Sequence, residues 1–485
     1  MSKQMNFYLK GQNKRFCFAQ KIMIGTVIFS GCVLSSSVKA EGSSKQKPNI
    51  LFFLLDDEGW KDTGCYGSDF IDTPQADLLA KQGVRFTQAY ASPVSSPTRT
   101  SLVTGQNSAR HGVWEVIGVV DRPYAKMKSP TLKEDFDPQL KTYASVLRAN
   151  GYNCALVGKW HAGGQPWEHG FEKVSTNAIH DSDLKKMIQG PDYKNLHAYT
   201  ARSLQYIRDH KDHPFMLCVS HHMVHAGLEA DPTLTKKYID RLRMSGITDV
   251  HPKYAAMVEM ADQSLGLVVD ELKKQGIYDN TIIVYYSDNG GLLGDMYLNL
   301  PTPKATTLSP LRGQKGSLYE GGLRVPLIIK WPGVTTPGEV SSAQVCSYDL
   351  YPTFIEMAGA ALPSHQKIDG LSLVPLLKNK KKELDRKALY WYFPTSMWAR
   401  NPQSAIREGD YKLIINYNSG KLELYNLKED IGETINLVDK RKDKAQQLYN
   451  DFNNWRLSIG VENPTPNPNY NPIKEKQLGQ QKWWK

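Results

Sequence analysis

Four groups of polar side chains stand directly after apolar runs of this sequence, and their residue types could act together. These groups are Asp56-Asp57 after residues 49–55, Lys159 and His161 after 154–157, His225 after 215–220, and Asp288-Asn289 after 281–286. Carboxylate and amide oxygens are hard ligands that suit Ca²⁺ or Mg²⁺, whereas a zinc site would more often contain histidine or cysteine. Each acid pair taken alone is better explained by a helix cap or a turn. Together, the four groups predict an active site in which the oxygen ligands suit a divalent cation.

The elements that must position these groups alternate along the chain. Continuous apolar runs, typical of strands buried on both faces, cover 49–55, 154–157, 215–220, 281–286 and 325–329. Helical patterns lie between them at 140–149, 199–208 and 254–274. The alternation favours an α/β sandwich with a large central sheet. In open α/β sheets, ligands bind beyond the carboxyl ends of the strands, which is where the polar groups stand.

A serine-rich stretch, Ser95 to Gly105, follows a strand-like segment at 84–90 and has the signals of a helix start. Pro97 suits the first helical turn, where no amide donor is needed. Ser95 or Ser96 could cap the free amides, and a side chain at Ser95 would lie at the positive end of the helix dipole. On this stretch alone, an ordinary helix cap is the simpler interpretation.

The same stretch resembles the signature of the type I sulfatases, which belong to the alkaline-phosphatase superfamily. That signature is Cys or Ser, any residue, Pro, a small residue, Arg, and later a Thr-Gly pair, and Ser95 to Gly105 meets every fixed position. The resemblance implies that Ser95 is oxidised to formylglycine, an aldehyde whose hydrate attacks sulfur with one hydroxyl and expels sulfate with the other. It also implies an alkaline-phosphatase-like sandwich with a large mixed sheet and a small C-terminal antiparallel sheet packed by a helix.

The resemblance assigns roles to the other polar groups. It implies a Ca²⁺ site, with Mg²⁺ also acceptable, formed by Asp56, Asp57, Ser95, Asp288 and Asn289. Gly158 to His161 is similar to the family's Gly-Lys-Trp-His motif, in which the lysine binds sulfate and the histidine contacts the formylglycine diol. The remaining family roles fall on Arg99, which stabilises the diol, His225, which contacts sulfate, and Lys315, which contacts sulfate and the leaving oxygen.

One detail of the expected chemistry, the identity of the general acid, stays open at this point. A sugar alkoxide is a poor leaving group, so a general acid is needed, and both His225 and Lys315 are candidates. The family often has proline where Val224 stands, a departure that concerns loop shape more than chemistry. A serine at the first signature position resembles the route that uses an anaerobic radical maturase. His221 and His222 are expected to support the site rather than react.

Composition and the N-terminus place the chain among exported proteins. The formal charge is +11, but the first 40 residues hold six Lys or Arg and no acid, so the remainder is only mildly basic. No basic run is interleaved with aromatic residues, which argues against nucleic acid as a partner. A basic segment, a short apolar run at 22–34 and Val38-Lys39-Ala40 predict a signal peptide cleaved near Ala40 and a periplasmic or secreted protein. Lipoprotein processing at Cys32 ranks second, and no apolar run is long enough to span a membrane.

The sequence also predicts how the chain is divided into domains. We expect a signal peptide at 1–40, a catalytic domain at 41–380 and a smaller C-terminal subdomain at 381–485. Short runs between 388 and 425 predict an antiparallel meander, residues 440–459 a helix, and the Pro/Asn-rich 463–472 an irregular tail. Cys154 and Cys218 lie in strand-like runs and are expected to be buried free thiols.

The sequence therefore predicts an exported sulfatase that removes O-sulfate from a carbohydrate, with a sulfated saccharide as substrate. Similarity to bacterial glycan-degrading sulfatases favours sulfated galactose or N-acetylgalactosamine from host or algal polymers. A sugar pocket could be lined by Trp167, His169, Trp398 and Arg400. The alternatives are a phosphomonoester or phosphonate hydrolase of the same superfamily, for which no second cluster of metal ligands is present, and a glycan-binding protein with an inactive site.

Overall fold

The computed structural model describes residues 46–119, 122–174, 191–247, 249–293, 305–396 and 401–478. The predicted signal peptide and the alternative lipoprotein site at Cys32 lie outside these residues, as do Trp398 and Arg400.

A seven-stranded mixed sheet forms the centre of the fold, in the order β5-β6-β1-β7-β8-β2-β9. Its strands are β1 (Asn49–Leu55), β2 (Val84–Phe86), β5 (Asn153–Gly158), β6 (Phe215–Ser220), β7 (Thr281–Ser287), β8 (Leu327–Lys330) and β9 (Glu339–Ser341). β5, β6, β1 and β7 run parallel, whereas β8 is antiparallel to both β7 and β2. The carboxyl ends of four neighbouring strands therefore meet at one edge, as the sequence predicts.

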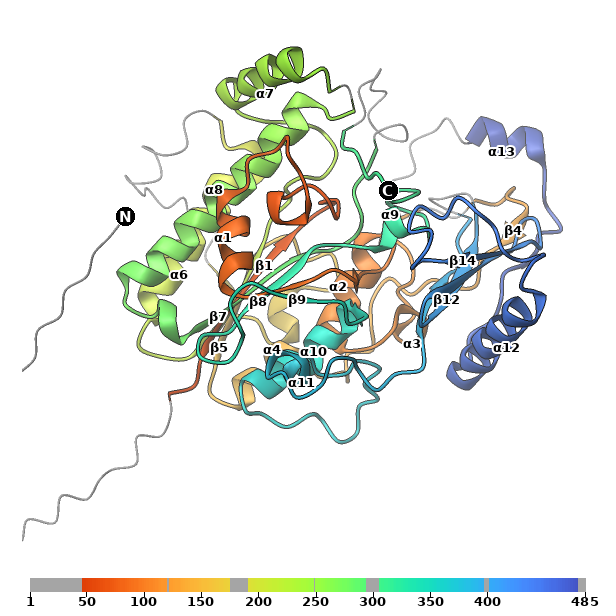
Figure 1. Ribbon diagram of the computed structural model, residues 1–485. Helices are drawn as coiled ribbons and strands as arrows, with labels where there is room; N and C mark the ends of the chain where they lie inside the picture. Colours follow the sequence, from red (N-terminus) through yellow and green to blue (C-terminus); the bar gives the residue numbers. More distant parts are fainter. Residues whose placement is uncertain are drawn as a thin grey trace, which may run out of the picture. The chain divides into compact units, whose positions relative to one another are not determined.

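Helices cover both faces of this sheet (Figure 1). On one face, α1 (Pro74–Gln82), α6 (Leu196–His210) and α8 (Pro252–Lys274) share an apolar core with alternate strand residues such as Leu51 and Phe53. On the other, α2 (Ser95–Thr104), α4 (Tyr143–Ala149), α10 (Leu350–Met357) and α11 (Val374–Leu377) pack on the intervening residues such as Ile50 and Phe52. Burial on both faces explains why these strands are continuous apolar runs.

A second sheet of four antiparallel strands stands beside the first, in the order β11-β12-β13-β14. Its strands are β11 (Leu389–Phe393), β12 (Gln403–Glu408), β13 (Tyr411–Asn416) and β14 (Leu422–Asn426), and α12 (Lys442–Ile459) packs on it through Leu448 and Phe452 (Figure 1). The expected fold class, a large mixed sheet with a small C-terminal antiparallel sheet and helix, is confirmed.

The remaining strands and α-helices are short, apart from the 14-residue α7. They are β3 (Ala89–Tyr90), β4 (Met127–Lys128), β10 (Val345–Cys346), β15 (Thr465–Pro466), α3 (Ser108–His111), α7 (Pro232–Ser245), α9 (Glu320–Leu323) and α13 (Pro472–Leu478).

The expected irregular tail at 463–472 is wrong in part, because this segment is docked on the protein. Thr465 and Pro466 form β15, which pairs antiparallel with β4. The side-chain amide of Asn467 donates to the carbonyl oxygens of Pro123 and Ala125, and Arg122 forms a 2.5 Å ion pair with Glu475 of α13. The Pro/Asn-rich segment therefore forms only a two-residue ladder with β4, together with side-chain contacts.

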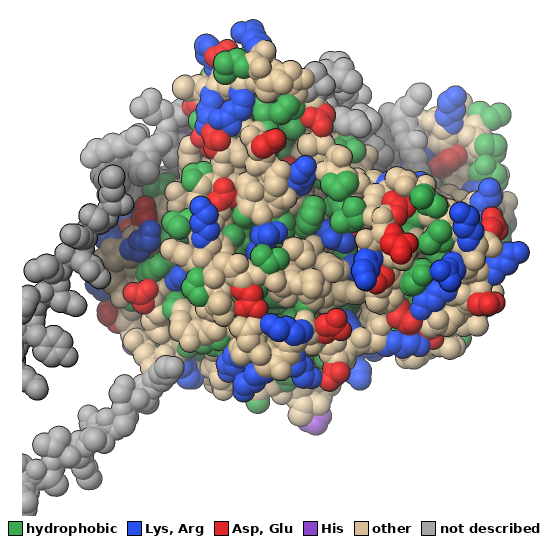
Figure 2. All heavy atoms as spheres, viewed as in Figure 1, with side chains coloured by type: hydrophobic (Ala, Val, Ile, Leu, Met, Phe, Trp, Pro, Cys, Tyr) green, Lys and Arg blue, Asp and Glu red, His purple; other side chains and the backbone are tan. Residues whose placement is uncertain are grey.

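The surface and the thiols agree with an ordinary globular chain. Figure 2 shows basic and acidic side chains interspersed on the visible face. Cys154 and Cys218 are buried free thiols, which confirms the expectation, and Cys346 is also buried and free. None of the helices in the described part of the chain combines the length and apolarity needed to cross a bilayer.

Candidate active site

Backbone contacts between the strand ends bring the predicted acids together. The Asp288 amide, one residue beyond β7, donates to the Leu55 carbonyl at the end of β1 over 3.1 Å. The Asp57 amide donates to Asp288 Oδ1 over 3.2 Å, and Asp57 itself adopts the left-handed conformation with φ of 67°. On the other side, the Val224 amide donates to the Asp56 carbonyl over 2.6 Å. These contacts fix the carboxyl groups at the shared edge of β1, β6 and β7.

Ser95 lies at the centre of this group, and it is not a helix cap. α2 begins at Ser95 itself, with Val94 as the residue before it and no capping side chain. The Ser95 hydroxyl is 3.2 Å from both Asp56 Oδ1 and Asn289 Oδ1, so its single proton can serve either oxygen. The Ser96 hydroxyl accepts from the Ile117 amide. The expected capping role of these serines is therefore wrong, because both hydroxyls are used by groups outside the helix, while Pro97 lies in the first turn as expected.

Three cations hold the acids: Arg99 and Lys315 are buried, and the Lys159 side chain is 10% exposed. Lys159 Nζ donates to Asp56 Oδ2 over 2.5 Å and lies 3.4 Å from Ser95 Oγ. Lys315 Nζ donates to Asp57 Oδ1 over 2.6 Å. Arg99, one helical turn after Ser95, donates from Nε to Asp288 Oδ2 over 2.8 Å. The sequence placed Arg99 on the same side of the helix as Ser95, and the structure brings both into the site.

Burial and the neighbouring charges shift the pKa values of two carboxyl groups of the site in opposite directions. Burial raises the pKa of Asp288 to about 6, and the neighbouring Asp56 carboxylate adds to this rise. Burial also opposes ionisation of Asp56, but the surrounding cations, Lys159 foremost, outweigh it and hold the pKa of Asp56 well below its usual range. For Lys315, burial is outweighed by the attraction of Asp57, so its pKa is raised and it stays charged at neutral pH.

The donor set fits a divalent cation with a preference for oxygen. Asp56, Asp57, Asp288 and Asn289 are at most 1% exposed. Asp57 Oδ2 is buried and has no hydrogen-bond partner among the described residues, which is a costly state for a carboxylate oxygen. Asp56, Asp57 and His225 can each offer an atom within 4.8 Å of one another. Carboxylates converging with amide and hydroxyl oxygens would hold Ca²⁺ or Mg²⁺, as the sequence predicts.

Two histidines stand at different depths of this site. His225 Nε2 lies 3.8 Å from Asp57 Oδ2, and its side chain is 38% exposed, which places it on the solvent side. His161, in the left-handed conformation with φ of 55°, has its pKa lowered to about 3 by burial and by the charge of Lys159. His161 Nδ1 has no hydrogen-bond partner in the described chain. His161 is therefore neutral at pH 7 and has a ring nitrogen free for a ligand.

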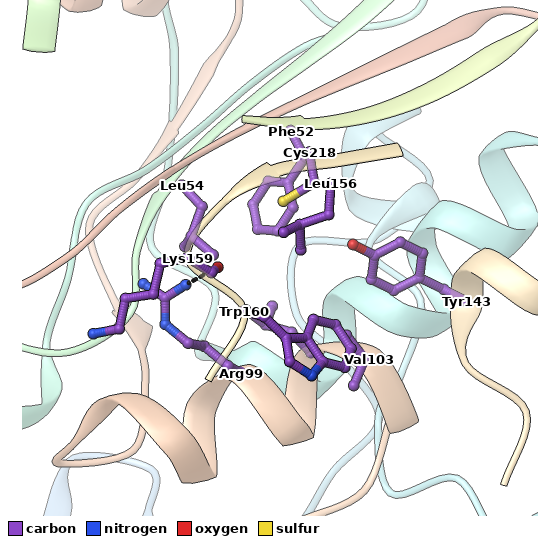
Figure 3. Close-up of a pocket in the computed structure, with 10 residues that line it drawn as sticks. Phe52, Leu54, Arg99, Val103, Tyr143, Leu156, Lys159, Trp160 and Cys218 are labelled. Carbon is purple, nitrogen blue, oxygen red and sulfur yellow. Dashed lines mark hydrogen bonds between the residues drawn. The ribbon is translucent and has the colours of Figure 1, made fainter. Parts of the chain in front are cut away.

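The Lys159-Trp160 pair turns one side chain to the site and the other to the core. In Figure 3, Trp160 lies with Phe52, Val103 and Tyr143 around a small apolar cavity, whereas the amine end of Lys159 points away from these rings. The cavity measures about 10 Å³, too little for a substrate. Arg99 closes its polar side by donating to the Lys159 carbonyl oxygen over 3.0 Å (Figure 3). Packing of Trp160 against the core therefore helps to fix the backbone position of Lys159.

The two described candidates for a sugar pocket are not placed beside Ser95 by any contact. His169 stacks on Trp160 with 5.8 Å between ring centroids, and its ring is tilted by 41° against that of Phe136 at 4.4 Å. Trp167 is 46% exposed, and the ammonium of Lys173 lies 5.1 Å from the centre of its ring. Binding of sugar by Trp167 or His169 remains a prediction.

One residue that supports the site is missing from the sequence-based predictions. Ser220, the last residue of β6, accepts from Arg99 Nη1 over 2.7 Å and donates to the Lys159 carbonyl over 2.7 Å. The sequence feature that could have identified Ser220 is its position as a polar residue at the carboxyl end of a buried strand. Of the two expected supporting histidines, His221 bonds with Ser264 at 3.0 Å and His222 with Tyr199 at 3.3 Å, and neither bonds with Ser95.

Comparisons with known proteins agree with this geometry. A model of the sulfatase family matches residues 48–360, and a model described as "N-sulphoglucosamine sulphohydrolase, C-terminal" matches residues 314–456. A sulfatase of Formosa agariphila is 32% identical over an alignment of 531 residues that covers 90% of this chain and 93% of the relative. Human N-acetylgalactosamine-6-sulfatase is 30% identical, with 73% of this chain and 70% of the relative covered.

A solved structure shows the same fold. It is that of Ps i-CgsB in complex with k-i-k-neocarrahexaose, which is 27% identical and has a TM-score of 0.69. The match covers 90% of this chain and 98% of the other.

Proposed function

Because this chain belongs to the sulfatase family, and is therefore a sulfuric ester hydrolase, we propose that it hydrolyses O-sulfate esters of a carbohydrate at Ser95. The observation that carries the proposal is the position of Ser95 Oγ, 3.2 Å from oxygens of Asp56 and Asn289 and 3.4 Å from Lys159 Nζ. This position would set the nucleophilic oxygen between oxygens suited to a divalent cation and the ammonium group of Lys159.

Two groups that the family implies would complete this site. Asp56, Asp57, Asp288 and Asn289, with residue 95, would hold the divalent cation, which supplies positive charge to neutralise a sulfuryl oxygen. Formylglycine, formed from Ser95, supplies a hydrated aldehyde as nucleophile and a route for releasing sulfate. Both groups fit the buried oxygen donors and the orphaned oxygen of Asp57.

The chain's own residues then bind and orient the ester. Lys159 and Lys315 present ammonium groups to the anionic sulfuryl group, where charge grows on the oxygens during the reaction. Arg99, held by Asp288 and Ser220, keeps a fixed cation one turn from the nucleophile. His225, on the solvent side, and Lys315 are the two residues from which the leaving oxygen can take a proton.

The names of the relatives support a sulfated saccharide as substrate. One relative is an N-acetylgalactosamine-6-sulfatase, and one structural neighbour was solved in complex with an oligosaccharide. We propose sulfated galactose or N-acetylgalactosamine as the sulfated unit. We also propose that residues 1–40 direct export to the periplasm or beyond, that 41–380 and 381–485 form catalytic and C-terminal parts, and that a radical maturase converts Ser95.

Mass spectrometry of the peptide that contains Ser95, on protein co-expressed with a radical maturase, tests this proposal. Conversion of serine to formylglycine removes two hydrogens, about 2 Da, and the converted protein should hydrolyse an aryl sulfate and sulfated monosaccharides. Ser95→Ala is the control that keeps the fold and loses both signals. An unmodified Ser95 combined with hydrolysis of an aryl phosphate would instead support the phosphatase alternative.

A further inference from the structure

The turn that precedes α6 contains two successive residues in the left-handed conformation. Lys194 has φ of 54° and ψ of 26°, and Asn195 has φ of 58° and ψ of 25°. A side chain makes this conformation unfavourable, although asparagine tolerates it through local hydrogen bonds. Lysine has no such compensation. Strain of this kind concentrates at functional sites, so the Lys194 side chain calls for an explanation.

The Lys194 ammonium lies beside the loop that carries His225. Its Nζ donates to the Ala226 carbonyl over 2.9 Å, and the same carbonyl lies 3.4 Å from His225 Nδ1. Further along α6, the Tyr199 hydroxyl bonds to His222 of the same loop. Gly227 leaves room for the ammonium, since a Cβ there would lie 3.0 Å from Lys194 Nζ. The turn and the start of α6 therefore pack directly against the loop that carries His225.

The contact with Ala226 does not neutralise the charge of Lys194, because a carbonyl group carries no net charge. Lys159 and Lys315 each bond to a buried carboxylate, whereas Lys194 donates to a neutral carbonyl and, in the part of the chain that the structure describes, forms no ion pair. An ammonium group has three donors, so two remain for a ligand. His225 is the exposed member of the site, so a cation next to it lies on the outer side of the sulfate-binding residues.

We propose that Lys194 is a specificity residue that binds a second anionic group of the substrate, a sulfate or a uronate carboxylate outside the ester that is hydrolysed. This inference rests on the proposed function, since the hydrolysed ester is assigned to Ser95, Lys159 and Lys315. A cation held beside the His225 loop by a strained turn is suited to an anion that arrives with the sugar. It selects polyanionic saccharides over singly charged esters.

Competitive inhibition of aryl sulfate hydrolysis tests the role of Lys194 in the full-length, matured protein. The inhibitors are inorganic sulfate, a disulfated disaccharide, and a disaccharide with one sulfate and one uronate. Lys194→Asn keeps a residue that tolerates the backbone and removes the charge, Lys194→Arg keeps the charge, and Lys236→Asn removes an exposed lysine of α7. We expect Lys194→Asn alone to raise the inhibition constants of the doubly charged disaccharides about 10-fold, or 1.4 kcal/mol, and that of sulfate less than about 2-fold.

The pattern among the three inhibitors decides the outcome. If one disaccharide is affected and the other is not, the affected one identifies the second anion. Equal weakening of all three would overturn the inference in favour of a role in positioning His225, and no weakening would overturn it outright. Hydrolysis of the aryl sulfate by the parent protein tests the proposed function separately. If the parent is inactive, calorimetric titration of the same ligands into the parent and Lys194→Asn gives the same ratio.

Discussion

Lys412, a buried cation of the C-terminal sheet, should be among the residues whose replacement costs the most stability. Lys412 of β13 is fully buried and donates over 2.9 Å to Glu320, the first residue of α9. It also forms a 2.9 Å ion pair with Glu433, and the Glu320 amide donates to Glu433 over 2.7 Å. Lys412→Met keeps the length of the side chain and leaves two buried carboxylates without this cation. Breaking a buried ion pair in this way costs about 3–5 kcal/mol.

Urea denaturation of the full chain at pH 8 measures this loss. The matched control is Lys444→Met, which removes a lysine 2.8 Å from Glu408 in a pair whose side chains are 23% and 21% exposed, and which should cost at most about 1 kcal/mol. Burial raises the pKa of Glu433 to about 7, while Lys412 pulls it down. Without Lys412 the carboxyl takes up a proton more readily, so the deficit should shrink as the pH falls from 8 to 6. A loss below about 1 kcal/mol at pH 8, or one that grows on acidification, would refute this reasoning.

Three further predictions follow from the site and the core. Arg99→Lys should lower kcat/KM for an aryl sulfate by about 100-fold, because a single ammonium nitrogen does not reproduce the planar fork by which two guanidinium nitrogens reach Asp288 and Ser220, and unchanged kinetics would remove Arg99 from the proposed site. Chelation with EDTA, which removes both Ca²⁺ and Mg²⁺, should abolish hydrolysis and lower the unfolding midpoint, and Ca²⁺ or Mg²⁺ should restore both, whereas full activity in chelator would contradict a metal site. Burial lowers the pKa of His221 to about 3, below its unfolded value of 6.5, so this histidine stays neutral when folded and stability falls as the pH drops below 6.5. Between pH 7 and pH 5, His221→Gln should lose about 2 kcal/mol less stability than the parent in urea denaturation, and equal losses would show that His221 is not the responsible group.

The central strands could be predicted from the sequence because burial on both faces leaves an unmistakable pattern. β1 and β6 have the expected bounds, and β5 and β7 differ from expectation by one residue at their ends. β8 begins at Leu327 rather than Val325, because Pro326 has no amide to donate to a ladder. Since these strands are parallel neighbours, the polar residues after them had to converge, and this convergence is why Asp56 and Asp288 could be placed together.

The parts that could not be predicted depend on contacts between distant segments. The hydroxyls of Ser95 and Ser96 have the residue type of a helix cap, and only the folded chain shows that they bond outside α2. The tail at 463–472 has the composition of a loop, yet it docks because Asn467 finds two carbonyls more than 300 residues away in sequence. The strained Lys194 turn has no sequence signal, because lysine is not a residue that predicts a left-handed conformation.

The ion pairs at the site imply that metal and substrate bind cooperatively. Lys159 and Lys315 donate to Asp56 and Asp57, the same carboxylates that fit the divalent cation. A cation that takes these oxygens competes with the two ammonium groups and leaves them available to an anion. Binding free energies are reciprocal, so sulfate should in turn raise the affinity for the metal. Calorimetric titration of inorganic sulfate with and without saturating Ca²⁺ measures this coupling. Lys159→Met should reduce the coupling, because one of the two competing ammonium groups is then gone, and an unchanged sulfate affinity with Ca²⁺ in the parent protein would show that the lysines serve the carboxylates alone.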